Sequence, residues 1–82
     1  MAESEREELL KQLERVKAIG EKAYDEMYEA HSSSGATACY SEAKEAFYDA
    51  IGLARRLELP DEEAALDKRL AHIKAVFRGQ FT

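Results

Sequence analysis

The apolar residues of the chain recur at alternating steps of four and three positions, the spacing of one face of an α-helix. The first such series consists of Leu9, Leu13, Val16, Gly20, Ala23, Met27 and Ala30. Just before it, Ser4 and Glu7 have the spacing of a capping box, in which the two side chains satisfy backbone N–H groups at a helix start. The pattern therefore predicts an amphipathic helix from about residue 5 to about residue 31.

A second series with the same steps is formed by Ala36, Tyr40, Ala43, Phe47, Ala50, Ala54 and Leu57. It predicts a helix over residues 36–58. Many members of this series are alanines, and such small side chains let helix axes approach closely. Cys39 falls beside the apolar face, where a cysteine behaves as a small hydrophobic residue.

A third helix is predicted over residues 61–78. Pro60 cannot continue the preceding helix but fits the first turn of a new one, and the acidic residues after it complement the positive helix end. The apolar face is then formed by Leu66, Leu70, Ile73 and Phe77. Arg78 followed by Gly79 is typical of a helix end, with glycine in the left-handed conformation.

No segment shows the alternation of a β-strand, so the sequence predicts an all-α protein. Three helices joined by short corners predict an antiparallel three-helix bundle that forms one domain over residues 1–82. With 45% apolar and 35% charged residues, the chain has enough apolar surface to fold.

The single cysteine cannot form a disulfide within the chain, and the first residues lack the basic and apolar stretches of a secretion signal. No apolar run approaches the roughly 18 residues of a membrane span. We therefore expect a cytoplasmic protein without membrane contact.

The net charge is −5, of which residues 1–31 contribute −4 while residues 61–82 are balanced. Nucleic-acid binding requires basic residues gathered on one face, so the acidic balance argues against such a partner.

Residues 31–44, HSSSGATACYSEAK, contain one histidine, the only cysteine and four serines. Because serine, threonine and glycine favour turns and caps, the stretch is predicted to be the corner between two helices, with Ser34 or Thr37 as the N-cap. The exposed amides of a helix start can also bind an anion, which makes His31, Ser34 and Thr37 candidate ligand-binding residues. A phosphate-binding P-loop is excluded, because the stretch lacks the required second glycine and the adjacent lysine.

Catalytic and metal-binding patterns are weak. Ser41 and Lys44 have the Ser-x-x-Lys spacing of penicillin-recognising enzymes, but the two further motifs of those enzymes are missing. Cys39 and His31 could form a thiolate pair, although a buried thiol is inert. Neither histidine follows a glutamate at the spacing of di-iron bundles, and one cysteine with two distant histidines cannot close a zinc site. We expect no metal, no cofactor and no enzymatic activity.

The series Tyr40, Ala43, Phe47, Ala50, Ile51 and Leu53 resembles the second helix of a tetratricopeptide repeat. Upstream, Ile19, Gly20, Ala23 and Tyr24 resemble the first helix of that repeat, in which glycine lets the two helices approach. The series over residues 40–53 is also similar to one in the microtubule-interacting and trafficking domain, a three-helix bundle. The resemblance implies a helical hairpin that binds a peptide or a partner helix.

The sequence favours a non-catalytic helical interaction or adaptor domain, with a protein partner or a second copy as its target. An alternative is a small regulatory domain that binds an anion or small ligand at the 31–37 corner. Candidate partner-binding residues are the tyrosines beside the apolar faces, the first leucines and the last phenylalanine: Leu9, Leu10, Leu13, Tyr24, Tyr28, Tyr48 and Phe81. If the second helix is shorter than the first, the leucines have no cover within the chain, which favours a homodimer.

Overall fold

The protein is a bundle of three α-helices in a computed structural model that describes residues 2–80. The helices are α1 (Glu3–Glu29), α2 (Ser33–Arg56) and α3 (Pro60–Gln80). Residues 2–80 contain no β-strand, so the predicted all-α fold is confirmed. Within the same range, no helix has the length and apolar character that crossing a membrane requires.

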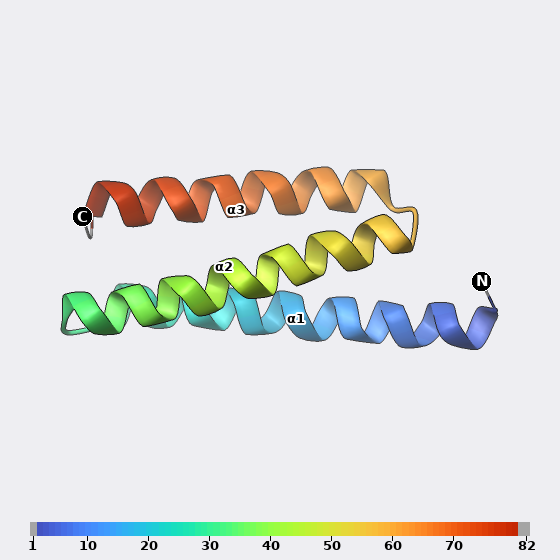
Figure 1. Cartoon of the computed structure of the whole chain (residues 1–82), viewed down its shortest axis with the longest axis horizontal. Helices are drawn as coiled ribbons and strands as arrows, with labels where there is room; N and C mark the ends of the chain where they lie inside the picture. Colours follow the sequence, from blue (N-terminus) through green and yellow to red (C-terminus); the bar gives the residue numbers. More distant parts are fainter. Residues whose placement is uncertain (1, 81–82) are drawn as a thin grey trace.

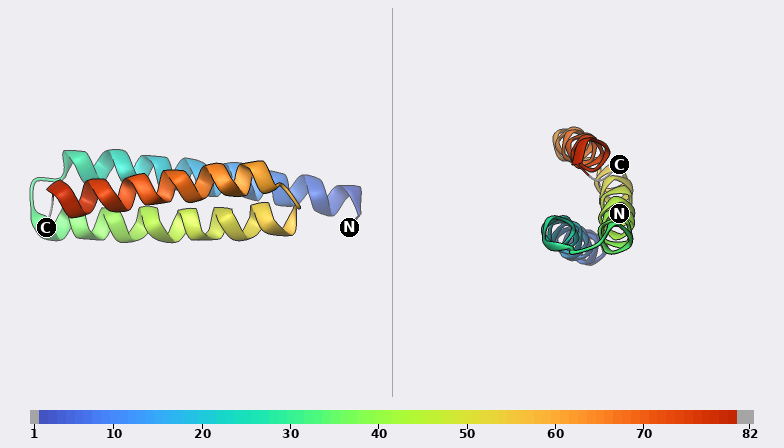
Figure 2. Two further views of the ribbon diagram at one scale, coloured as in Figure 1. Left: turned by 90° about the horizontal axis from the view of Figure 1, so that it is seen from above. Right: turned by 90° about the vertical axis from the view of Figure 1, so that its left-hand side faces the viewer.

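Successive helices run antiparallel and form a rod of 45 × 18 × 13 Å (Figure 1). Helix α2 lies in the middle, and both α1 and α3 pack along it. The view along the rod shows α1 and α3 on two different sides of α2 (Figure 2). The close backbone packing of the bundle is therefore that of α1 on α2 and of α2 on α3.

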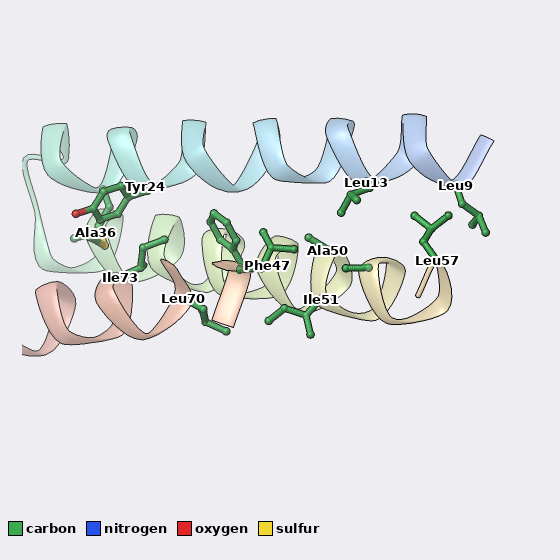
Figure 3. Packing of buried hydrophobic residues seen from close by; sticks show 13 residues of the cluster. Leu9, Leu13, Tyr24, Ala36, Phe47, Ala50, Ile51, Leu57, Leu70 and Ile73 are labelled. Atoms are coloured by element: carbon green, nitrogen blue, oxygen red, sulfur yellow. The ribbon is translucent and has the colours of Figure 1, made fainter. Parts of the chain in front are cut away.

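The three apolar series form the core, as predicted from their spacing (Figure 3). Helix α2 contributes the largest share of buried residues, which are Ala36, Ala43, Ala46, Phe47, Ala50, Ile51 and Ala54. Five of these seven are alanines, and their small side chains let the axes of the neighbouring helices come close. Cys39 is half-buried against this core, in agreement with its predicted place beside the apolar face.

The ring of Phe47 on α2 packs directly against Gly20 of α1. A Cβ atom placed on Gly20 would stand 2.7 and 2.9 Å from two carbons of this ring, distances that real side chains do not adopt. Phe47 is only 1% exposed, so its ring has little room to move aside. Glycine at position 20 is therefore a requirement of the packing, although it costs about 1 kcal/mol of helix propensity relative to alanine.

The predicted capping box at the start of α1 is wrong. The N-cap is Ala2, whose backbone is extended, and no side chain caps it. Ser4 already lies inside the helix, where its hydroxyl cannot serve as the cap. The first turn is instead favoured by the negative charges of Glu3 and Glu5 near the positive helix end.

The ends of the other helices also differ from the prediction. Ser32, and not Ser34 or Thr37, is the N-cap of α2, because its hydroxyl accepts a hydrogen bond of 3.1 Å from the Gly35 N–H. Gly79 does not end α3: its φ is not positive, and the helix continues to Gln80.

The turn between α2 and α3 is a Schellman motif built around Glu58. The N–H of Glu58 donates to the carbonyl of Arg55 at 3.1 Å, and the N–H of Leu59 donates to that of Ala54 at 2.9 Å. Glu58 has a φ of 57°, the left-handed conformation that glycine usually provides at this position. Pro60 then starts α3, as predicted.

We expect Gly20→Ala to lower the free energy of unfolding by about 1 kcal/mol, since overpacking against Phe47 outweighs the gain in helix propensity. Gly52→Ala is the matched control, because a Cβ on Gly52 meets no atom within 4 Å. It should raise stability by about 0.5–1 kcal/mol. Urea unfolding followed by circular dichroism measures both, and an equal stabilisation by the two substitutions would contradict the close approach.

A second prediction concerns Glu58. Glu58→Gly should stabilise the protein by about 1 kcal/mol, because the left-handed conformation is strained for any residue with a Cβ. Glu58→Ala keeps that strain and loses only the charge, so we expect it to stay within about 0.5 kcal/mol of the wild type. Equal midpoints of urea unfolding for Glu58→Gly and Glu58→Ala would show that the strain is absent.

Candidate interaction surface

Three of the predicted partner-binding residues are buried inside the chain. Leu9, Leu13 and Tyr24 are 8%, 2% and 7% exposed, so they offer almost no surface to a partner. The expectation that the first leucines lack cover is thus corrected for Leu9 and Leu13: Leu9 belongs to the same core cluster as Leu57 at the end of α2 (Figure 3). The part of α1 that extends beyond α2, before Leu9, has no large apolar residue (Figure 2).

Other predicted residues do lie on the surface. Leu10, Tyr28 and Tyr48 are 37%, 47% and 51% exposed. Ile19, which sequence reasoning did not select, is 43% exposed as well. Phe81 lies outside the described residues.

Tyr24 is the centre of a polar cluster that joins α1 to α3. Its hydroxyl donates to the oxygen of Tyr28 at 3.4 Å and lies 3.3 Å from Nε2 of His72. The two tyrosine rings meet edge to face, with centroids 5.2 Å apart. Burial of the hydroxyl, more than any other effect, raises the pKa of Tyr24 to about 12.

Ion pairs complete the contact between α1 and α3. Arg69 binds Glu21 through two hydrogen bonds of 2.8 and 2.6 Å, and its guanidinium lies 4.8 Å from the centre of the Tyr24 ring. The hydrogen bonds from Arg69 lower the pKa of Glu21, in spite of its partial burial. Lys17 similarly reaches Glu62 at 2.6 Å, and this hydrogen bond raises the pKa of Lys17. These ion pairs link the two outer helices.

The 31–37 corner offers fewer free polar groups for binding a ligand than its composition suggests. His31, Ser34 and Thr37 are all exposed. The hydroxyl of Ser32 caps α2, and that of Thr37 donates to the carbonyl of Ser33 at 2.8 Å. Hydroxyl groups in this corner are thus engaged in forming the helix start.

A surface groove of about 420 Å³ runs between α1 and α2. From α1 its walls contain Gln12, Arg15 and Val16. From α2 they contain Tyr48, Asp49, Gly52, Leu53 and Arg56. We call it the Gly52 groove, because the missing side chain of this glycine leaves the α2 backbone accessible in it. Of its residues, only Tyr48 was predicted from the sequence to bind a partner.

A second hollow lies at the opposite edge of α1, beside the turn between α2 and α3. Leu10, Leu13, Leu59 and Pro60 provide its apolar part. Its acidic part contains Glu14, Glu58, Asp61 and Glu62. Leu10 is therefore exposed next to several carboxylates.

In residues 2–80, no group of three or more histidine, cysteine, aspartate or glutamate side chains is placed to hold a metal ion. Comparison of the chain with models of protein families, with curated proteins and with solved structures finds no match.

The pKa of Tyr24 leads to a prediction for alkaline pH. In the unfolded chain this phenol ionises near pH 10, whereas in the folded protein it keeps its proton to about pH 12. The native state binds more protons in this window, so stability should fall as the pH rises from 10 towards 12. Tyr24→Phe should make this fall shallower.

Urea unfolding at several pH values between 9 and 11.5 measures this effect. Tyr48→Phe is the comparison, because it removes the hydroxyl of a half-exposed tyrosine, which accepts a hydrogen bond of 2.7 Å from Lys74. A pH dependence unchanged by Tyr24→Phe would contradict the buried hydroxyl.

Proposed function

We propose that the protein is a non-catalytic helical module that binds another protein chain, either a different partner or a second copy. The observation that carries this proposal is the exposure of large apolar side chains beside hollows between the helices. Tyr48 is half exposed in the wall of the Gly52 groove, and Leu10 is more than a third exposed in the second hollow. Tyrosine combines apolar area with a polar tip, which suits protein interfaces.

The placement of the charged residues supports the same proposal. Arg69 with Glu21, Lys17 with Glu62, and Arg55 with Glu63 form ion pairs between helices. Groups paired in this way connect the helices, and a raised pKa makes Tyr24 a poor base near neutral pH. The resemblance of residues 40–53 to a peptide-binding helical repeat also supports this proposal. A single cysteine, which forms no disulfide within the chain, is compatible with the reducing cytoplasm.

The alternative of a ligand site at the 31–37 corner has weaker support, because the hydroxyls of Ser32 and Thr37 take part in the helix start. A thermal-shift screen with phosphate and nucleotides at millimolar concentration separates the two proposals. We expect no shift in melting temperature, whereas a shift lost in His31→Ala would favour the ligand site.

The proposed function is tested by two measurements on the purified protein. Light scattering across a hundredfold dilution gives the mass in solution and reveals a second copy as partner. Selection from a displayed library of random peptides reveals whether the surface binds other chains. We expect at least one of them to detect binding that Tyr48→Ala or Leu10→Glu weakens about tenfold while helicity stays unchanged.

A monomer at every concentration, together with a selection that enriches no sequence, would contradict the proposed function. Binding that both variants leave at the wild-type strength would instead show that these side chains are not the contact residues.

A further inference from the structure

All four glycines of the chain lie within helices, and the two in helix interiors, Gly20 and Gly52, differ in what surrounds them. Gly20 is required because Phe47 occupies the space of its missing side chain. At Gly52 a Cβ would meet no atom within 4 Å, so the fold does not need glycine there. A glycine inside a helix costs about 1 kcal/mol relative to alanine, and one common reason for it is the close approach of another molecule.

The arginines of the chain point to the same groove. Arg6, Arg55, Arg69 and Arg78 have interactions with other groups of the chain. For Arg15 and Arg56, no hydrogen bond, ion pair or ring contact is found among residues 2–80. Both of these arginines line the Gly52 groove.

The groove therefore combines two unpaired guanidinium groups with an apolar floor. Val16 and Leu53 are half-buried beside Gly52, and Tyr48 provides an exposed ring. Within the walls of the groove, Asp49 carries the only carboxylate beside the two arginines. Arg56 also lines an adjoining hollow that contains Glu5 and Glu8. Arginine and tyrosine are, with tryptophan, the residue types enriched among those that dominate binding energies at interfaces.

We propose that the Gly52 groove binds an acidic amphipathic helix of a partner protein. This inference rests on the proposed function and names the chemistry of the partner. Small or apolar residues on one face of that helix pack against Val16, Gly52 and Leu53. Glutamate or aspartate residues beside this face pair with Arg15 and Arg56, whose planar guanidinium groups can bind a carboxylate through two hydrogen bonds.

The dimensions of the groove suit a helix. Its α2 wall spans residues 48–56, which is about 12 Å at 1.5 Å per residue, or two helical turns. A partner helix lying along α1 and α2 meets them as helices meet in other bundles, at axis separations of about 8–10 Å. The absence of a side chain on Gly52 permits the shorter of these separations.

The test begins with a displayed library of random 16-residue peptides, selected against the immobilised full chain. We expect enrichment of sequences that carry glutamate or aspartate beside an apolar helical face. A fluorescein-labelled synthetic copy of the best sequence then gives dissociation constants by fluorescence anisotropy, at low and high sodium chloride. Affinity should fall with salt, because charge pairs on a surface are screened.

Four variants locate the binding site. Arg56→Ala should weaken binding about tenfold, whereas Arg55→Ala, at the adjacent position but paired with Glu63, should leave it unchanged. Gly52→Leu should abolish binding, since its side chain fills the groove. Gly79→Leu adds the same side chain where a Cβ also meets nothing, and should bind like the wild type.

Thermal unfolding of each variant separates loss of fold from loss of binding. A Cβ at position 52 meets no atom within 4 Å, so we expect Gly52→Leu to keep a melting temperature at least equal to that of the wild type. As a final control, Arg15→Glu combined with Arg56→Glu should bind a peptide whose acidic residues are changed to lysine.

Enriched peptides that are basic or uncharged, or that bind Arg56→Ala and Gly52→Leu as strongly as the wild type, would overturn the inference and leave the proposed function standing. A dimer that Gly52→Leu dissociates would also overturn it, because the occupant would then be a second copy. Failure to enrich any peptide would overturn the inference, and only a monomeric mass at all concentrations would extend that failure to the proposed function.

Discussion

The contact between Phe47 and Gly20 sets the distance between α1 and α2, and the remaining surfaces follow from that distance. Because the ring lies where a Cβ would stand, the two backbones come close enough for the small alanines of α2 to fill the interface. The same separation brings Val16 and Leu53 to the floor of one groove. A wider spacing would open the core to water and remove the groove walls.

The two interfaces of α1 differ in chemistry. With α2 it shares a buried apolar core, whereas with α3 it shares the ion pairs of Glu21 and Lys17 and the hydroxyl of Tyr24. Exposed ion pairs contribute little to stability, so the hairpin of α1 and α2 should supply most of the folding energy. Polar contacts between α1 and α3 fix how α3 is placed, because each requires a specific partner.

Helix existence, order and core residues could be predicted from the sequence, because the steps of four and three directly reflect which face is buried. Helix ends could not: Ser4 has the right spacing for a cap, yet the helix starts earlier, at Glu3. The left-handed Glu58 carries no sequence signal, since its conformation is imposed by the turn into Pro60. The Gly52 groove could not be predicted from the sequence either, because it depends on which residues of α1 and α2 become neighbours. Its one sequence signal is Gly52, a glycine inside a predicted helix.

The contact at Gly20 can be observed directly by nuclear magnetic resonance. If the ring of Phe47 occupies the place of a Gly20 side chain, nuclear Overhauser cross-peaks should join the Gly20 Hα protons to the Phe47 ring protons, which lie well within the 5 Å range of the effect. Strong cross-peaks between these protons are the predicted result. Their absence, in a protein that is otherwise folded and helical, would contradict the packing on which the core and the groove depend.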